Sequence, residues 1–349
     1  MTLILDGRET SFTPGATILQ VADRAGTRLP RLCHHPSLAP EGSCRLCLVE
    51  DVKTGKLLPA CATPAMDGQQ IATSSLKVLA AQRFNLELIL ARHPLDCEAC
   101  DRDGACELQD LTQRMQIAPS TRQAPSPREK VDLSHPFVGF DPNLCILCHR
   151  CIRGCAEIQG RNAIGLYARG ADGRIGTGIV QNWGESICES CGTCVELCPS
   201  GALFDRPARE HRTGDPVEKV TTICGYCGVG CTLDLNVSGG RVRNVTSNWD
   251  RGVNRGALCV KGRFGHEFIH HPDRLDRPLI RSGEGFREST WDEALDLVAS
   301  RFAEIKIDAG PDAIGIIASA KATNEENYLI QKFARTVIGT NNVDHCARL

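Results

Sequence analysis

The chain has 349 residues, and its 40 Lys and Arg residues nearly balance 42 Asp and Glu residues, for a formal net charge of −2. This balance excludes the strongly basic class that binds nucleic acid, and a hydrophobic content of 42% excludes disordered and collagen-like chains. The sequence contains no apolar run of about 18 residues and no secretory signal, so it predicts a cytoplasmic protein without a membrane span.

The first predicted element is a hairpin, in which residues 3–6 and 9–12 flank the turn pair Asp6-Gly7. A short helix is predicted over residues 17–25, where Gly26 ends it. A longer helix is predicted over residues 76–91. Its expected apolar face consists of four leucines: Leu76, Leu79, Leu86 and Leu90.

Two polar stretches interrupt the chain. Residues 118–134 contain three prolines and no apolar period, which predicts a linker, and residues 206–215 form a second polar stretch.

Thr290 and Glu293 predict a capping box for a helix over residues 291–309. A short buried strand is then expected over residues 313–318, followed by a helix capped by Thr323 and Glu326. This pattern indicates the opening of an α/β domain, with a single strand.

Cysteine is the unusual residue, since the chain has 20 of them in tight clusters, which indicates metal binding in a reducing compartment. Nineteen fall into five groups with distinct spacings, and one histidine joins the second group. The groups are Cys33, Cys44, Cys47 and Cys61; His93, Cys97, Cys100 and Cys106; Cys145, Cys148, Cys151 and Cys155; Cys188, Cys191, Cys194 and Cys198; and Cys224, Cys227, Cys231 and Cys259.

The third and fourth groups repeat one pattern 43 residues apart, which indicates an internal duplication. In two-cluster ferredoxins the fourth cysteine of each run binds the other cluster. We therefore predict a crossed assignment, with Cys198 completing the site of the first three cysteines and Cys155 completing the second site. The first group resembles the plant-type [2Fe–2S] arrangement, and the fifth would hold a further cluster.

Structural zinc is the alternative for each Cys-x2-Cys pair, but zinc sites are normally built from two such pairs rather than from a triple with a fourth cysteine. His93 is the least secure ligand on chemistry alone, because a lone histidine before proline is more often an ordinary residue. Cys346 belongs to no group and is expected to be a small buried hydrophobic residue. The cysteine modules are small, so metal–thiolate bonds are expected to stabilise them, and the chain without metal is expected to be disordered before Arg274.

The order of these groups resembles the N-terminal half of three families: the large iron–sulfur subunit of respiratory NADH dehydrogenase, the iron-only hydrogenases, and the catalytic subunit of NAD-linked formate dehydrogenases. The segments 223–231 (ICGYCGVGC) and 256–265 (GALCVKGRFG) closely resemble the cluster-binding entry of molybdopterin oxidoreductases. In that family the lysine at the position of Lys261 relays electrons between the cluster and the pterin. Because the respiratory subunit usually lacks the duplicated pair, the resemblance favours formate dehydrogenase.

The resemblance implies an α+β multidomain iron–sulfur protein. Its expected parts are a β-grasp [2Fe–2S] domain over 1–78, a one-histidine, three-cysteine [4Fe–4S] domain over 79–117, the linker 118–134, a two-[4Fe–4S] ferredoxin-like domain over 135–210, a [4Fe–4S] domain of molybdopterin oxidoreductases over 217–273, and the start of the molybdopterin catalytic domain over 274–349.

The implied reaction is oxidation of formate to carbon dioxide at a molybdenum or tungsten centre with two molybdopterin guanine dinucleotides. Electrons would leave through one [2Fe–2S] and four [4Fe–4S] clusters towards a flavin-containing, NADH-binding subunit. No catalytic residue is expected in the chain itself, because the selenocysteine or cysteine metal ligand would follow Leu349 directly, and a UGA codon is expected there. The alternatives are a separate multi-cluster electron carrier, or a subunit of a respiratory NADH dehydrogenase or an iron-only hydrogenase.

Overall fold

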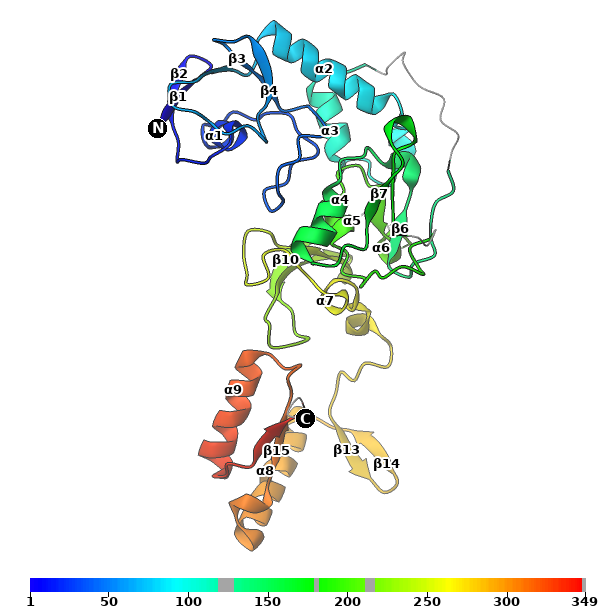
Figure 1. The fold of residues 1–349 in the computed structure, drawn as a ribbon. Helices are drawn as coiled ribbons and strands as arrows, with labels where there is room; N and C mark the ends of the chain where they lie inside the picture. The colour runs from blue at the N-terminus through cyan, green and yellow to red at the C-terminus, as the bar shows by residue number, and fades with distance from the viewer. Residues whose placement is uncertain (119–128, 179–181, 211–216, 347–349) are drawn as a thin grey trace. The chain divides into compact units, whose positions relative to one another are not determined.

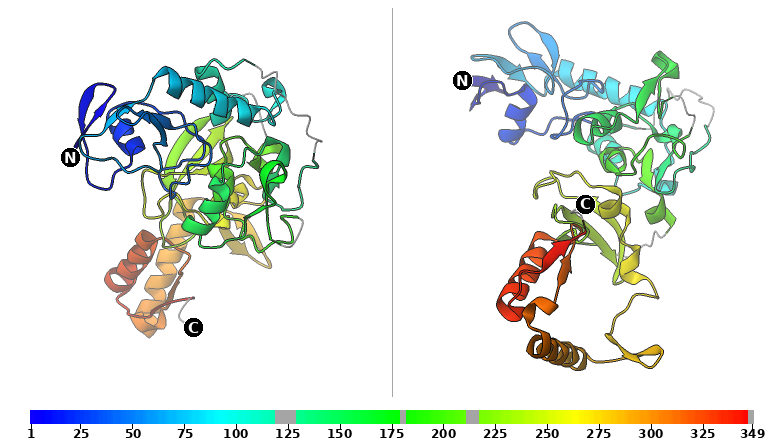
Figure 2. Two further views of the ribbon diagram at one scale, coloured as in Figure 1. Left: turned by 45° about the horizontal axis from the view of Figure 1, so that its top comes forward. Right: turned by 60° about the horizontal axis from the view of Figure 1, so that its bottom comes forward.

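The computed structural model describes residues 1–118, 129–178, 182–210 and 217–346. The chain divides into two compact units, Met1–Arg212 and Thr213–Leu349, and each is described by itself (Figures 1 and 2). Most of the predicted linker and the end of the second polar stretch lie outside the described residues, as do residues 347–349. No helix in the described part of the chain is long and apolar enough to cross a membrane.

The first unit begins with a five-stranded sheet in the order β2-β1-β5-β3-β4, in which only the β1–β5 pair is parallel. The predicted hairpin is confirmed, and Asp6 and Gly7 both have positive φ, as its tight turn requires. Helix α1 packs Ile18 and Leu19 into the core with Leu3 and Leu5. The elements are β1 (Thr2–Leu5), β2 (Arg8–Ser11), α1 (Ile18–Arg24), β3 (Leu48–Asp51), β4 (Lys56–Pro59) and β5 (Gln70–Ala72).

Helix α2 (Leu76–Leu90) forms where the sequence predicts it, and the second half of its predicted face is confirmed, since Leu86 and Leu90 are buried. The first half was wrong, because Leu76 is 88% exposed and Leu79 is 47% exposed. There the buried face consists of Val78 and Gln82, whose amide Nε2 donates to the Leu48 carbonyl at 2.9 Å. This hydrogen bond satisfies a polar side chain on the face that packs against β3. Helix α3 (Glu107–Arg114) follows.

The internal duplication is visible in the backbone of the next segment. Leu147 and His149 have positive φ, and so do Ser190 and Gly192, which lie 43 residues later in the sequence. In each copy this turn leads into a short helix. The elements are β6 (Val138–Phe140), α4 (Arg150–Arg153) with a π-turn over Gly154–Ile158, β7 (Gly165–Tyr167), β8 (Arg174–Gly176), α5 (Thr193–Leu197), β9 (Leu203–Asp205) and α6 (Arg206–Glu210).

Part of the predicted linker is structured, since Asp132 forms an antiparallel bridge with Phe140 of β6. Strand β6 also pairs with β9, so residues on both sides of the two duplicated cysteine runs close one small sheet. This pairing brings the entry and the exit of the ferredoxin-like segment together.

The second unit begins with an antiparallel meander of β10 (Glu218–Ile223), β11 (Thr232–Ser238) and β12 (Arg241–Ser247). Cys224 lies in its core with Leu233, Val245 and Leu258. Helix α7 (Val260–Phe264) contacts β12, and the hairpin of β13 (Leu279–Ser282) and β14 (Gly285–Glu288) comes next.

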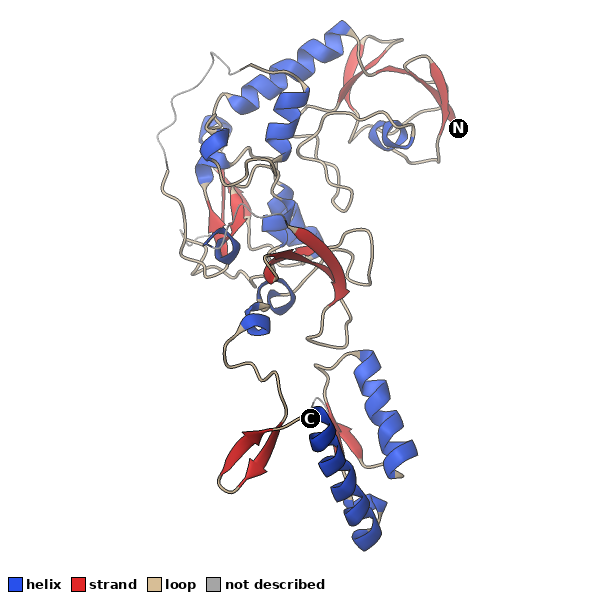
Figure 3. Cartoon of the chain, turned by 180° about the vertical axis from the view of Figure 1, so that it is seen from behind, coloured by secondary structure: helices blue, strands red, loops and turns tan. Residues whose placement is uncertain are grey.

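The α/β opening is confirmed with two corrections. The strand β15 (Ile316–Ala318) is shorter than the predicted 313–318 and is not buried, since Ile317 is 81% exposed. It also pairs in parallel with β16 (Val343–His345), so the expectation of a single strand was wrong. The pair was missed because Val343–His345 is a three-residue strand without apolar alternation. Helices α8 (Trp291–Ala309) and α9 (Asn324–Phe333) accompany this pair (Figure 3).

The two predicted capping boxes differ. At Thr323 both reciprocal hydrogen bonds with Glu326 form. At Thr290 the hydroxyl accepts from the Glu293 amide at 3.2 Å, but the Glu293 carboxylate turns instead to Arg287 and to Ser289. The capping box at Thr290 is therefore half formed, because Arg287 and Ser289 compete for the Glu293 carboxylate.

Candidate metal centres

The thiols of the first group lie together between the N-terminal sheet and its long loop. The Cys44 amide donates to Cys33 Sγ at 3.5 Å, and the Cys61 amide donates to Cys47 Sγ at 3.5 Å. Hydrogen bonds from the Cys44 and Cys61 thiols hold the pKa of Cys33 well below its usual range. The same contacts raise the pKa of both donors. Three thiols from the segment between α1 and β3 and one from the segment after β4 thus lie close together.

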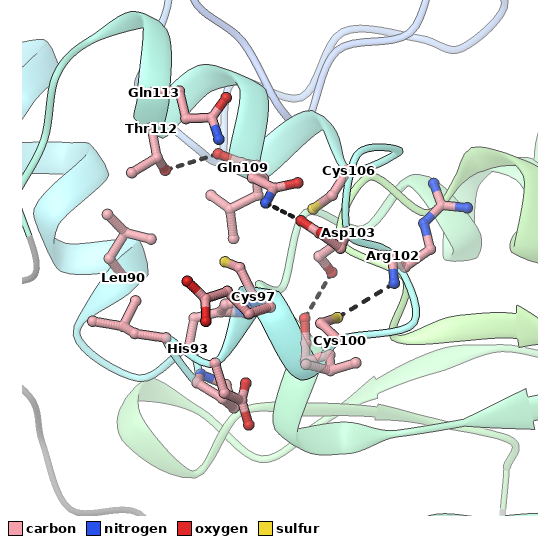
Figure 4. Close-up of a pocket in the computed structure, with 17 residues that line it drawn as sticks. Leu90, His93, Cys97, Cys100, Arg102, Asp103, Cys106, Gln109, Thr112 and Gln113 are labelled. Carbon is pink, nitrogen blue, oxygen red and sulfur yellow. Dashed lines mark hydrogen bonds between the residues drawn. The ribbon is translucent and has the colours of Figure 1, made fainter. Parts of the chain in front are cut away.

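The second group lines a cavity of about 280 Å³ (Figure 4). His93 follows the end of α2, Cys97 and Cys100 bracket a 3₁₀ turn, and Cys106 precedes the first turn of α3. His93 Nδ1 is buried and has no hydrogen-bond partner among the described residues. An unpaired buried nitrogen is costly, so its place beside three thiols fits a metal ligand.

Burial favours the neutral form of His93. Burial lowers the pKa of its imidazole, while Asp96 and Asp141 oppose that shift. Burial likewise raises the pKa of the Cys97 and Cys106 thiols. A neutral imidazole is the form that binds a metal, and thiols at such sites are deprotonated when a metal replaces their protons.

The duplicated groups come together in the crossed arrangement. A small cavity is lined by Cys145, Cys148 and Cys151 from the first run and by Cys198 from the second. Burial raises the pKa of Cys145 to about 11 and that of Cys148 to about 12. Cys155 instead lies within electrostatic reach of the second run: Cys188, Cys191 and Cys194.

One turn ties the His93 cavity to the Cys145 cavity. Ser200 lines both cavities, and its hydroxyl donates to the Leu144 carbonyl at 2.6 Å. The adjacent Pro199 carbonyl accepts from Cys106 Sγ at 3.5 Å and from the Glu107 amide at 3.1 Å. The turn after Cys198 therefore lines both cavities and contacts Cys106 of the His93 site.

The fifth group lies in the second unit, where the Cys224 amide donates to the Cys231 carbonyl at 2.8 Å. Cys231 is within electrostatic reach of Cys224, Cys227 and Cys259, and Cys259 is exposed at the start of α7. Lys261 is exposed, with Nζ 5.8 Å from the centre of the Tyr226 ring. Its charge opposes the rise that burial causes in the pKa of Cys224. Lys261 thus acts electrostatically on this group.

Cys346 is not a buried hydrophobic residue, so that expectation was wrong. It is exposed, and its Sγ lies 3.5 Å from the Ser319 hydroxyl. The hydroxyl lowers the pKa of the Cys346 thiol. Sequence patterns gave no sign of this contact, because it joins the ends of the paired strands β15 and β16.

Among the described residues, no group of three or more His, Cys, Asp or Glu side chains is arranged around a point that would suit one metal ion. Structural zinc needs four thiolates at about 2.3 Å from one centre. In a [4Fe–4S] cluster each of the four terminal ligands binds a different iron, and in a [2Fe–2S] cluster two ligands share each iron. The spacing of the third and fourth groups, each a triple of cysteines with a fourth, favours clusters over zinc.

Five family models match consecutive parts of the chain. They are a 2Fe-2S iron-sulfur cluster binding domain over residues 1–75, the NADH-ubiquinone oxidoreductase-G iron-sulfur binding region over 82–120, the ferredoxin-like domain of NADH-quinone oxidoreductase subunit 3 over 135–204, the molybdopterin oxidoreductase Fe4S4 domain over 217–271, and molybdopterin oxidoreductase over 274–349. The chain is an iron–sulfur region of the molybdopterin oxidoreductase family.

Relatives of this iron–sulfur region carry several names. The chain is 35% identical to "Probable oxidoreductase YjgC" of Bacillus subtilis over 99% of its length and 39% of that protein. It is 38% identical to a protein of Rhizobium meliloti named as a subunit of NADH-quinone oxidoreductase, over 99% of the chain and 40% of the relative. "Putative formate dehydrogenase YrhE" of Bacillus subtilis is 36% identical, over 99% of the chain and 39% of that relative. The chain thus spans about two fifths of these relatives.

A solved structure is also similar: a chain of NAD+-reducing [NiFe]-hydrogenase in the H2-reduced state. It is 34% identical, with a TM-score of 0.55, over 59% of this chain and 87% of that chain. The family model that matches residues 135–204, which include the duplicated pair, is named after NADH-quinone oxidoreductase, so the pair does not by itself favour formate dehydrogenase over the respiratory subunit. Domain composition alone therefore does not distinguish a formate dehydrogenase from the respiratory subunit.

Proposed function

We propose that the chain is the electron-transfer region of an NAD-linked formate dehydrogenase. It would hold one [2Fe–2S] and four [4Fe–4S] clusters on the five groups described above. The observation that supports this most directly is the His93 cavity, where an imidazole whose buried Nδ1 has no hydrogen-bond partner among the described residues lines the same space as three thiols. The relatives named putative formate dehydrogenase support the choice of substrate.

The residues present fit such clusters. Four groups offer four thiolates each and the second offers three thiolates and an imidazole, which are the ligand types that hold iron–sulfur clusters. Burial keeps the free thiols protonated, as at Cys145 and Cys148, whose pKa values are raised. Binding of iron would therefore release the protons of these thiols.

When bound, the clusters supply one-electron transfer, and the chain positions and tunes them. His93 contributes a neutral ligand where the other sites have a thiolate, which favours the reduced state of its cluster. Ser200 and Pro199 fix the spacing between the His93 site and the Cys145 site through their contacts with Leu144 and Cys106. Lys261 places a positive charge beside the fifth group, on the pterin side in the family it resembles.

The whole protein would oxidise formate at a molybdenum or tungsten centre with two molybdopterin guanine dinucleotides. Its electrons would pass to a flavin-containing subunit that binds NADH. A relative named as a subunit of NADH-quinone oxidoreductase supports such a partner.

Iron and sulfide analysis of anaerobically purified protein tests the cluster assignment. We expect about 18 iron atoms per chain, since one [2Fe–2S] and four [4Fe–4S] clusters hold that number. Four or more zinc atoms per chain with little iron would refute it.

A role in the oxidation of NADH by quinone is the second candidate, favoured by the Rhizobium meliloti relative and by the model for residues 135–204. The two candidate functions are distinguished by assaying the whole protein in its native complex for formate-dependent NAD reduction and for bound molybdenum or tungsten. Activity with bound metal supports formate dehydrogenase. A fully iron-loaded complex without either metal and without formate activity supports the second candidate.

A further inference from the structure

One guanidinium joins the first cysteine group to the third. Arg153, at the end of α4, donates from Nη2 to the Cys33 carbonyl at 2.5 Å and to the Cys148 carbonyl at 3.3 Å. Its side chain is only 12% exposed. Cys33 belongs to the [2Fe–2S] group and Cys148 to the crossed [4Fe–4S] group. A single buried cation thus contacts the main chain of one cysteine from each group.

The surroundings hold Arg153 in this position. Its Nη1 donates to the Ala39 carbonyl at 2.6 Å, and its Nε lies 2.9 Å from Glu41 Oε2. The other Glu41 oxygen lies 2.5 Å from His149 Nδ1, and Glu157 accepts from the Ala39 amide at 2.7 Å. The loop after Cys33 is therefore fastened to α4 and the π-turn at four points.

The neighbouring cation does not take over this role. Arg150 is also buried, at 3% exposure, but both its terminal nitrogens bind the Glu107 carboxylate, at 2.7 and 2.9 Å. Its pair with Glu107 joins α4 to α3. Of the two arginines, Arg153 is the one whose hydrogen bonds reach carbonyls of both cysteine groups.

We propose that Arg153 is a positioning residue that sets the spacing of the [2Fe–2S] site and the Cys145–Cys198 site and raises the reduction potentials of both together. The proposal rests on the cluster assignment proposed above. A cation that donates to the carbonyl of a ligating cysteine draws electron density away from the sulfur, so the more negative, reduced cluster is stabilised. Because one guanidinium serves both sites, their potentials should change together.

Redox titration followed by electron paramagnetic resonance, on the whole reconstituted chain, measures both potentials directly. Arg153→Gln should lower both reduction potentials by ~59 mV, which for one electron is a tenfold decrease in the ratio of reduced to oxidised cluster. Arg153→Lys keeps the charge, so both potentials should stay close to those of the wild type. Glu41→Gln removes the anion beside the guanidinium and should move both potentials upwards.

Arg83→Gln is the matched control, because Arg83 is an exposed arginine of the same unit whose partner is Glu87, on α2. It should leave both potentials unchanged. A shift of only one cluster in Arg153→Gln, or a downward shift in Glu41→Gln, overturns the proposal, since simple loosening of the loop would move both variants the same way.

If Arg153→Gln fails to bind its clusters, Glu41→Gln alone decides, and unchanged or lowered potentials there reject the proposal. If the wild-type chain itself binds no clusters, the cluster assignment fails instead. The two failures are therefore distinguishable.

Discussion

His93 shows how one side chain can tune a site that three thiols already define. Its imidazole is buried beside the cavity, has a lowered pKa and has no partner for Nδ1 among the described residues. As a ligand it would be neutral, whereas a thiolate carries a negative charge. As a ligand, His93 would therefore affect the reduction potential of the cluster more than its attachment.

His93→Cys is expected to keep the cluster and lower its reduction potential, on the order of 100 mV, because the added negative charge disfavours the reduced state. Redox titration of the purified variant measures the shift. If every cluster signal stays as in wild type, His93 is not a ligand.

Lys261→Ala is expected to leave the fifth cluster bound but to slow its reduction by formate in the whole enzyme. A decrease of about tenfold corresponds to ~1.4 kcal/mol in the barrier. Stopped-flow reduction of the enzyme measures the rate. Lys219, an exposed lysine on β10 that pairs with Asp234, gives the control variant Lys219→Ala. Equal rates in the two variants would make Lys261 an ordinary surface residue.

Spacing in the sequence predicted which cysteines gather, because ligands on tight loops are close along the chain. The structure added the residues that act between groups, such as Arg153 and Ser200. Neither stands in a recognisable pattern, since each contact joins segments more than 50 positions apart. Cys346 was misjudged for a related reason, as its exposure depends on which strands surround it.

At the scale of elements, the closure of the ferredoxin-like segment depends on β6 and β9. Gly139 on β6 lies directly opposite Phe204 on β9, and a Cβ on Gly139 would come within 2.2 Å of the Phe204 ring. The ring covers the space that a side chain would fill, and Arg209 stacks on it at 4.5 Å. This pair can close only if position 139 has no side chain.

Gly139→Ala is therefore expected to destabilise the loaded protein by about 1–3 kcal/mol through overpacking, because a rigid ring must move. Anaerobic thermal unfolding measures the loss. Gly165→Ala on β7 is the matched control, since a Cβ there meets no atom within 4 Å, and its effect should stay within about 0.5 kcal/mol. Equal melting temperatures for the two variants would contradict the argument.

Helices and hairpins were predicted well where local signals were strong, as at Asp6-Gly7 and Thr323. The buried face of α2 was predicted correctly only at Leu86 and Leu90, because near its start Gln82 is buried with a hydrogen bond to a strand that lies 34 residues away in the sequence. Strand β16 was missed because its pairing with β15 is non-local.

At the scale of the whole chain, the two parts of the first unit differ in what stabilises them. The N-terminal sheet has an apolar core of its own, which includes Leu3, Leu5 and Ile18. Residues 135–210 consist of short strands and short helices around two cysteine groups. Burial of so little apolar surface does not suffice without metal.

Removal of iron by a chelator under reducing conditions is thus expected to unfold residues 135–210 before the N-terminal sheet. Hydrogen exchange measured by mass spectrometry should rise at β6 and β9 while β1 and β3 stay protected. Simultaneous loss of protection in both parts would show that the sheet also depends on metal.

The crossed arrangement of the duplicated runs constrains the order of biosynthesis. Cys145, Cys148 and Cys151 leave the ribosome well before Cys198, which lines the same cavity. A nascent chain that ends before Cys198 has only three of the four thiols of the first site. Its Cys155 likewise lacks the three cysteines of the second run, which complete the second site. Neither site can be completed by the first half of the segment, so loading of both is deferred until translation has passed Cys198, and a ribosome that stalls earlier leaves a product that cannot retain either cluster.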